Sequence, residues 1–222
     1  MAHTPHLFLA PPWSGESISL SAQQSNHLFK ALRLGPGSPV TYTDGRGLFG
    51  SGELTNTHLT RGVENMVSPP IDLEIAVVPP HERERVRFLV EKAAELEVRR
   101  IRWLRSRFGN ARPSQAARAG EWAIAALEQS RGAWLTLVED DWVRPLDLDP
   151  RLPTWVADRD GERSVPTPPL RVVVGPEGGW AEEELPATWP RLALGRTILR
   201  TETAVVAAIV AVSSYSTNFS GD

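Results

Sequence analysis

The chain has 222 residues, 41% of them hydrophobic and 23% charged, with a net charge of −3, which is typical of a soluble globular protein. It contains no cysteine, and its five histidines form no HxH or HExxH pattern, so we expect neither disulfides nor a metal site. The longest apolar run covers only residues 204–212 and the N-terminus lacks a signal-peptide pattern, so we expect a cytoplasmic protein without a membrane partner.

The first seventy residues are rich in Gly, Pro, Ser and Thr. Residues 38–54 contain two short alternating runs around the turn DGRG, which predicts a β-hairpin within a small β-barrel. Residues 26–34 are typical of a short helix, which GPG ends. Three basic residues lie on this predicted helix: His27, Lys30 and Arg33. They are either ordinary surface residues or contacts to phosphates.

The stretch SPP at 68–70 predicts a linker, and we therefore divide the chain into domains 1–70 and 71–222. After it, strand and helix patterns alternate. Strands are expected over 71–78, 99–106, 154–158, 171–175 and 191–195, and helices over 82–98, 114–130 (with Ser114 as its cap) and 203–217. This alternation favours an α/β domain with a mostly parallel sheet covered on both faces. The last helix is apolar nearly all round, so it should be buried in a core or in a subunit interface.

Residues 81–118 hold eleven Lys and Arg against five Asp and Glu, a net charge of +6 in a mildly acidic protein. Such a segment either follows the phosphates of a nucleic acid or forms a solvated helix face.

Two stretches share the order of strand, glycine turn and helix: VVVGPEGGWAEEEL (172–185) and LALGRTILRTETAVVAAIV (192–210). Ligands of parallel sheets bind beyond the carboxyl ends of the strands, where glycines let them reach the backbone. Neither stretch matches GxGxxG or GxxxxGK[ST], so a Rossmann site and a P-loop are both disfavoured. The acidic run 182–184 would repel a phosphate, which favours a neutral or cationic ligand.

The stretch LRTET at 199–203 allows two interpretations. In the first, Arg200 pairs with Glu202 or Glu177, and a threonine hydroxyl caps the helix. In the second, the planar guanidinium of Arg200 binds a phosphate or carbonyl of a substrate, and Glu177 orients a ligand amine or a base edge.

Five stretches together resemble the ribosomal RNA small subunit methyltransferase E family: 27–47, 91–104, 125–131, 172–185 and 192–209. GPEGG followed by LRTETA is the most specific of these matches. The resemblance implies a PUA-like β-barrel over 1–70 and a SPOUT-type domain over 71–222, with a C-terminal deep trefoil knot that binds S-adenosylmethionine. It also implies a homodimer that methylates N3 of a uridine in small-subunit (16S) ribosomal RNA within the assembled subunit.

Carried over residue by residue, the resemblance places the cofactor beside Val174, Gly175, Glu177, Gly178, Gly179, Leu194, Gly195, Ile198, Leu199, Arg200 and Thr203. Arg200 is the expected catalytic residue, holding the nucleotide phosphate or the charge that develops on the base. Glu202 or Glu177 is expected to orient the base or to relay its proton. The expected RNA contacts are His27, Lys30, Arg33, Arg107 and Arg112.

The chain departs from the family pattern at Glu97, where the family has glycine. If the backbone there is left-handed, Glu97 costs about 1 kcal/mol. Ala181 replaces a capping serine, and the segments 105–110 and 131–136 lack parts of the family's charged motifs.

Two other functions remain open from the residues alone. One is a non-catalytic protein that binds RNA and dimerises, with a degenerate cofactor pocket. The other is a nucleotide hydrolase or transferase that uses the glycine turn for phosphate, although the chain lacks the P-loop lysine.

Overall fold

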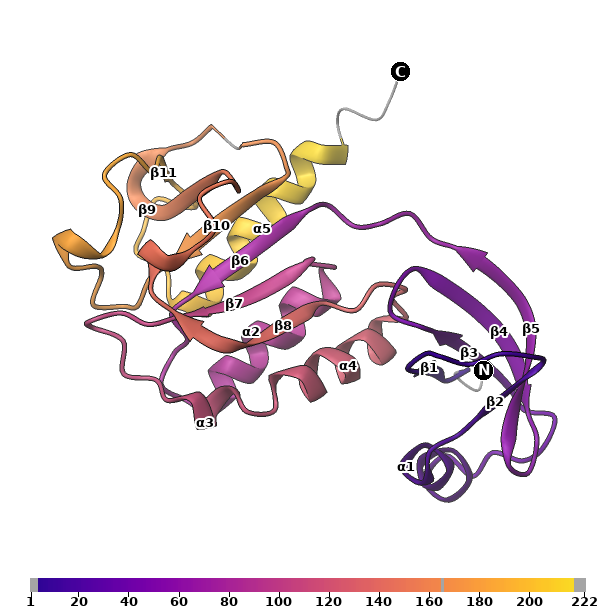
Figure 1. The fold of residues 1–222 in the computed structure, drawn as a ribbon. Coiled ribbons are helices and arrows are strands. Elements are labelled where there is room, and N and C mark those ends of the chain that lie inside the picture. The colour runs from indigo at the N-terminus through magenta and orange to yellow at the C-terminus, as the bar shows by residue number, and fades with distance from the viewer. Residues whose placement is uncertain (1–3, 165, 218–222) are drawn as a thin grey trace. The chain divides into compact units, whose positions relative to one another are not determined.

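The computed structural model describes residues 4–164 and 166–217, and the chain folds as two compact units (Figure 1). Met1–Pro69 and Leu127–Leu135 form the first unit, and Pro70–Ala126 and Thr136–Asp222 form the second. No helix in the described part of the chain combines the length and the hydropathy that a bilayer span needs.

A five-stranded sheet in the order β1-β3-β4-β5-β2 forms the first unit. Its strands are His6–Phe8 (β1), Ser17–Ser19 (β2), Pro39–Thr43 (β3), Leu48–Leu54 (β4) and His58–Met66 (β5). Strands β3 and β4 form the antiparallel hairpin predicted around DGRG, whereas β1 pairs with β3 in parallel. Inward-facing side chains form one core: Leu7, Leu9, Ile18, Leu28, Val40, Tyr42, Leu54 and Leu59.

The helix predicted over 26–34 is present but starts earlier. Helix α1 (Ala22–Ser25) continues into a π-helical segment η1 (Asn26–Ala31). The start is fixed by reciprocal hydrogen bonds, because Ser21 Oγ accepts the Gln24 N–H at 3.2 Å and Gln24 Oε1 accepts the Ser21 N–H at 2.9 Å.

The segment 127–135 completes the first unit. The Phe8 N–H donates to Glu128 Oε1 at 2.9 Å, and the buried Thr43 hydroxyl donates to the Ala133 carbonyl at 2.9 Å. Burial raises the pKa of Glu128 above its usual value. This segment therefore satisfies backbone and side-chain groups of β1 and β3 that would otherwise lack partners.

The second unit holds a six-stranded sheet in the order β11-β9-β10-β6-β7-β8, in which every pair is parallel. The strands are Leu73–Val77 (β6), Arg100–Leu104 (β7), Leu137–Val143 (β8), Thr154–Glu162 (β9), Leu170–Val174 (β10) and Arg191–Leu192 (β11). The helices are Arg83–Glu95 (α2), Pro113–Ala116 (α3), Ala119–Ser130 (α4) and Thr201–Thr217 (α5), with short 3₁₀ turns Pro145–Asp147 (η2) and Glu182–Glu184 (η3). The mostly parallel sheet predicted from the alternation is confirmed.

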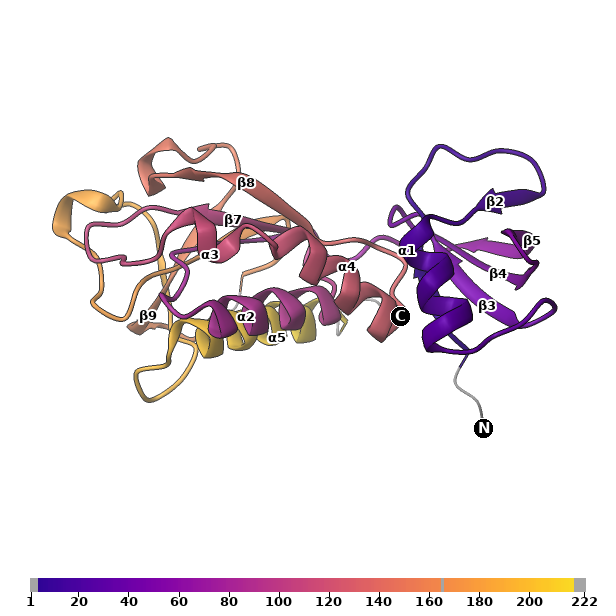
Figure 2. The ribbon, with the colours of Figure 1, turned by 90° about the horizontal axis from the view of Figure 1, so that it is seen from below.

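The two faces of this sheet are covered differently. Helices α2 and α5 lie side by side on one face (Figure 2), where α5 buries Val205, Ala208, Ile209 and Val212. The other face is covered by irregular segments, and Leu148, Trp180, Leu185 and Trp189 from them pack on Ala76 and Val173. Both faces are thus buried, which explains why β10 is apolar at four of its five positions.

Two local expectations are wrong, and one strand was not anticipated. The helix expected over 114–130 is two helices, α3 and α4, and Ser114 lies inside the first turn of α3 rather than at its cap. The turn GPEGG leads to only three residues of 3₁₀ helix, since Pro186 cannot continue a helix. Strand β8 (LVEDDWV) was not anticipated, because its charges hide the apolar pattern of an edge strand.

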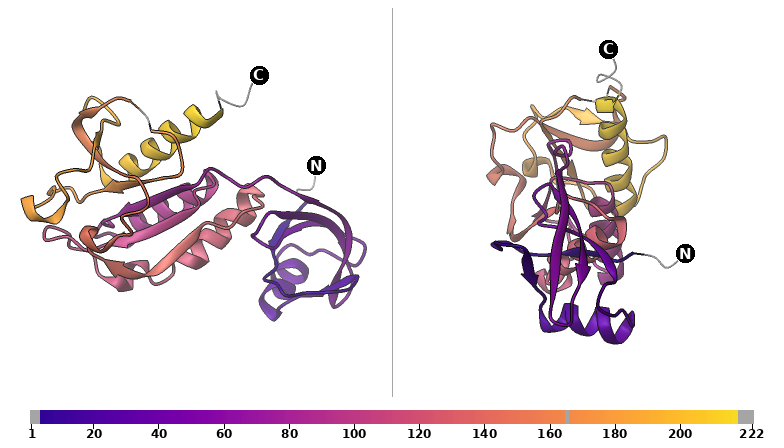
Figure 3. Two further views of the ribbon diagram at one scale, coloured as in Figure 1. Left: turned by 45° about the horizontal axis from the view of Figure 1, so that its top comes forward. Right: turned by 90° about the vertical axis from the view of Figure 1, so that its right-hand side faces the viewer.

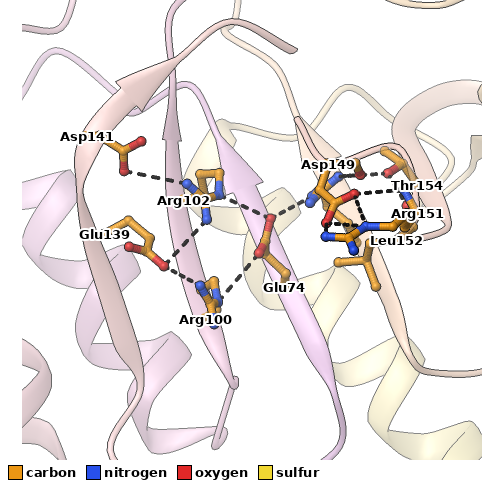
Figure 4. Close-up of polar contacts among 10 residues, drawn as sticks. Glu74, Arg100, Arg102, Glu139, Asp141, Asp149, Arg151, Leu152 and Thr154 are labelled. Carbon is orange, nitrogen blue, oxygen red and sulfur yellow. Dashed lines mark hydrogen bonds and ion pairs between the residues drawn. The ribbon is translucent and has the colours of Figure 1, made fainter. Parts of the chain in front are cut away.

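Glu139 and Asp141 of β8 belong to a network of ion pairs on the face of the sheet that the helices do not cover (Figure 4). The side chains of Glu74 on β6 and Arg171 on β10 are buried and bond to each other, Nε to Oε1, at 2.6 Å. Arg102 on β7 reaches Glu74 at 3.4 Å and Glu139 on β8 at 3.4 Å. Alternating cations and anions therefore cross four neighbouring strands.

We expect Arg171→Met to destabilise the protein by about 3–5 kcal/mol, because it leaves the buried carboxylate of Glu74 without its closest cation. Denaturant unfolding measures this change. The matched control is Arg151→Met, which removes an exposed ion pair with Asp149 and should cost about 0.5 kcal/mol or less. Equal losses in the two variants would contradict the assignment.

Helix α2 ends at a left-handed residue, as its sequence suggested. Glu97 has φ 55°, the Val98 N–H donates to the Ala93 carbonyl at 2.9 Å, and the Glu97 N–H donates to the Ala94 carbonyl at 3.1 Å. This pair of bonds is a Schellman motif, in which glycine is the favoured residue at the left-handed position.

Glu97→Gly is therefore expected to stabilise the protein by about 1 kcal/mol, since the Cβ is the source of the strain. Thermal unfolding checks this. Glu97→Ala keeps the Cβ and should give no such gain; a gain in both variants would point to the charge instead.

Candidate functional site

Two crossover loops meet at the carboxyl end of the parallel sheet. The turn after β10 and the loop between β11 and α5 share a cavity of about 610 Å³, whose third wall is residues 157–160 of β9. Figure 3 shows these orange segments gathered at one end of the sheet, beside the start of α5. The Thr201 hydroxyl, at the start of α5, donates to the Gly175 carbonyl at 3.2 Å and so joins the two loops.

Most of the residues predicted for a cofactor site line this cavity: Val174, Gly175, Glu177, Gly179, Leu194, Gly195, Ile198 and Leu199. Three do not. Gly178 packs against Phe108 instead, Thr203 is exposed in the first turn of α5, and Arg200 lines a neighbouring cavity. The sequence missed Trp180 and Thr201, which line the main cavity.

The glycines of the site are required for different reasons. A Cβ on Gly175 would lie 2.5 Å from Nε1 of Trp180, so packing alone demands glycine there. Gly179 has φ 75°, which favours glycine in the turn closed by its N–H bond to the Pro176 carbonyl. Gly195 has neither reason, since a Cβ would meet Leu199 only at an ordinary 3.7 Å. Its bare backbone is therefore free to be approached by a ligand.

The charge of the main cavity favours a cation. Its lining includes four carboxylates, Asp158, Asp160, Glu177 and Glu182, and two guanidinium groups, Arg159 and Arg191, which gives a net charge of −2. The arginines pair with the carboxylates of the β9 segment, Arg191 with Asp158 at 3.3 Å and Arg159 with Asp160 at 2.9 Å. Of the other two carboxylates, Glu177 is bound by Arg85 of α2, whereas Glu182 of η3 forms no ion pair within residues 4–164 and 166–217.

A second cavity of about 520 Å³ adjoins the first and shares Glu177, Ile198 and Leu199 with it. Arg200 lines it with an exposed side chain. Within residues 4–164 and 166–217, Arg200 forms no ion pair, so its guanidinium group is available to an anion from outside.

The two carboxylates that the sequence suggested as ion-pair partners of Arg200 are bound instead by Arg85 of α2. Arg85 Nη2 contacts Glu177 Oε1 and lies 2.6 Å from Glu202 Oε2, while Arg85 Nε lies 3.1 Å from Glu202 Oε1. Burial acts to raise the pKa of Glu202, but the hydrogen bonds from Arg85 and from the Glu202 backbone, together with the charges of Arg85 and Arg200, hold that pKa below its usual value. The simple pairing of Arg200 with Glu202 or Glu177 is thus wrong.

The helix pattern places Arg85 beside the buried face of α2, but it does not identify the partners of this residue. Arg85 precedes Leu89 by four residues and therefore flanks the buried stripe of α2, which also includes Val86 and Val90. A charged residue at such a position needs a partner from another element.

The predicted RNA contacts are all exposed: His27, Lys30, Arg33, Arg107 and Arg112. The first three lie on or just after η1 in the first unit, and Arg33 has a left-handed φ of 54°. Arg107 and Arg112 lie between β7 and α3 in the second unit, and Arg107 is 3.4 Å from Glu183. No group of three or more potential metal ligands is found in the described part of the chain.

The chain is similar to known proteins over most of its length. The family model for an RNA methyltransferase domain matches residues 67–213. The structure of ribosomal RNA small subunit methyltransferase E from Neisseria gonorrhoeae, bound to S-adenosyl methionine, is 26% identical with a TM-score of 0.85, and the match covers 96% of this chain and 98% of that one. A probable rRNA-methyltransferase from Porphyromonas gingivalis is 23% identical with a TM-score of 0.77, covering 95% and 99%. A putative methyltransferase from Legionella pneumophila, solved with its cofactor SAM, is 20% identical with a TM-score of 0.80, covering 96% and 98%. The family resemblance seen in the sequence is therefore confirmed.

The glycine analysis predicts opposite outcomes for two substitutions. Gly175→Ala should destabilise the protein by about 1–3 kcal/mol, because the new Cβ overlaps the Trp180 indole. Gly195→Ala should change stability by about 0.5 kcal/mol or less. Denaturant unfolding of both variants is the measurement, and a large loss in Gly195→Ala would show that packing, rather than ligand access, demands glycine there.

Proposed function

Because the chain belongs to the RNA methyltransferase domain family, we propose that it transfers a methyl group from S-adenosylmethionine to N3 of a uridine in 16S ribosomal RNA. The observation that carries this proposal is the cavity shared by the two crossover loops, with its net negative charge and its unhindered Gly195 backbone. The Neisseria structure, similar over nearly the whole chain, supports the ribosomal substrate.

The residues of the main cavity fit the cofactor. A volume of about 610 Å³ lies within the range of small-molecule sites. Apolar side chains such as Leu185, Leu194 and Ile198 suit the adenine ring, and the surplus carboxylates suit the positive sulfonium and amine. When bound, S-adenosylmethionine supplies an electrophilic methyl group.

The chain's own residues contribute mainly position. N3 of uridine is a weak acid, and it lies on the edge of the ring that forms base pairs. The base must therefore be unpaired or extruded before N3 can react. We place the acceptor nucleotide in the second cavity, where Arg200 binds its phosphate or the negative charge that develops on the base. In-line displacement then depends on how accurately the two cavities are held together.

The carboxylates act by orientation in this proposal. Glu202 is 12% exposed and bound to Arg85, and a carboxylate with a lowered pKa is a weak proton acceptor. In this proposal Glu177, which lines both cavities, orients the base as a hydrogen-bond acceptor, and Glu202 binds Arg85 rather than relaying a proton. No histidine follows His81 in the chain, so we assign the proton to solvent within the site.

The remaining parts of the proposal concern architecture. We propose that the C-terminal segment forms a deep trefoil knot, that the first unit is a PUA-like RNA-binding barrel, and that the protein works as a cytoplasmic homodimer on assembled small subunits. The exposed basic residues His27, Lys30, Arg33, Arg107 and Arg112 are the proposed contacts to the RNA backbone.

The decisive experiment maps N3-methyluridine in rRNA from cells that lack the protein. The proposal expects one such mark to disappear and to return when purified protein and S-adenosylmethionine are added to assembled small subunits. Calorimetry with the cofactor separates the alternative of a non-catalytic RNA-binding protein, which would give no binding heat.

Arg200→Ala should lower the methylation rate by about 10²–10³-fold while cofactor affinity is retained, because Arg200 lines the second cavity and not the first. Single-turnover rates and calorimetry measure the two effects. Arg196→Ala, an exposed change in the same loop, should leave both unchanged. A near wild-type rate for Arg200→Ala would remove Arg200 from the mechanism.

A further inference from the structure

One arginine joins three segments where the two cavities meet. Arg85 projects from the first turns of α2 and is 20% exposed. Its guanidinium group binds Glu202 of α5 through two nitrogens and contacts Glu177 of the glycine turn. The remaining nitrogen, Nη1, lies 3.1 Å from Glu82 of its own helix. The side chain of Arg85 thus connects helix α2, the glycine turn and helix α5.

These contacts of Arg85 lie at the boundary between the two cavities. Glu177 lines both of them, and Glu202 belongs to the first turn of α5, which holds the Gly175 carbonyl through Thr201. The same Arg85 nitrogen, Nη2, serves both carboxylates. Without the cation, the two carboxylates that share Nη2 would repel each other, and Glu177 would move away from α5.

We propose that Arg85 is a positioning residue of the methyl-transfer site, which fixes Glu177, on the wall between the two cavities, to Glu202 in the first turn of α5. The inference rests on the proposed function. Arg85 acts through the two carboxylates: it joins Glu177 to the first turn of α5 and thereby sets the distance between cofactor and acceptor base.

The first test measures cofactor binding, which needs no RNA. Arg85→Met should weaken the affinity for S-adenosylmethionine by about tenfold, as expected for the loss of charged hydrogen bonds that hold the cavity wall. Arg85→Lys keeps the charge and should recover part of the affinity. The matched control is Arg87→Met on the same helix, which removes only an exposed pair with Glu91 and should bind as the wild type does.

The second test uses pH, to which a purely structural role would be indifferent. The charged groups facing Glu202 are Glu82 and Arg85 from α2, Glu177 from the turn, and Arg200 beside it. In the wild type the pKa of Glu202 is lowered, so the carboxylate stays ionised through neutral pH. In Arg85→Met burial, which raises that pKa, is opposed only by the backbone hydrogen bond of Glu202 and the charge of Arg200, so the pKa should rise relative to the wild type. The acid limb of the kcat/KM profile should therefore move to higher pH in this variant and not in Arg87→Met.

A double-mutant cycle shows whether Arg85 acts through Glu202. Once Glu202→Gln has removed the carboxylate charge, adding Arg85→Met should cost less than it does in the wild type. Additive losses would overturn the inference, as would wild-type affinity and an unmoved pH profile in Arg85→Met.

If Arg85→Met fails to fold, the same double-mutant cycle is made with Arg85→Lys in its place, combined with Glu202→Gln. A wild-type protein that binds no cofactor would overturn the proposed function and this inference together, whereas wild-type binding with an unaffected Arg85→Met would overturn this inference alone.

Discussion

The site depends on a constraint of parallel sheets. A parallel strand must be entered from the same end as its neighbour, so each connection crosses the sheet and the carboxyl ends of all strands lie at one edge. Here β10 lies between β9 and β6, and the loops that leave β10 and β11 return to the same edge. The main cavity forms between these two loops at that edge, and its third wall is supplied by β9.

Within that edge, packing and function make separate demands on glycine. Gly175 is needed because the Trp180 indole occupies the space of a side chain, and Gly179 because the turn has a left-handed backbone. Only Gly195 lacks such a structural reason. A glycine-rich turn is therefore a weaker indicator of a ligand than its composition implies, and the useful signal is the glycine that the fold does not require.

The elements that sequence could predict are those with strong periodicity. The apolar stripe of α2, the hairpin around DGRG and the buried strands β6 and β10 were all expected close to their observed places. The left-handed residue at Glu97 was anticipated from the missing glycine. Strand β8 was missed because charges that pair across strands look like loop charges in a linear sequence.

The candidate site was predictable in part. The two loops carry recognisable motifs, and eight of the eleven expected cofactor residues line the main cavity. Arg85 was not found, because its partners Glu177 and Glu202 are 92 and 117 residues away along the chain. Long-range ion pairs depend on how helices and turns are brought together, and no local pattern encodes that arrangement.

The segment Leu127–Leu135 has a consequence for how this protein can be divided. It belongs to the first unit although it lies more than fifty residues beyond the end of Met1–Pro69. A fragment cut after the SPP stretch would leave the Phe8 amide and the Thr43 hydroxyl without Glu128 and Ala133. The first unit is therefore not a contiguous cassette that gene fusion or recombination could transplant whole, because it needs the segment that follows it from the second half of α4 onward.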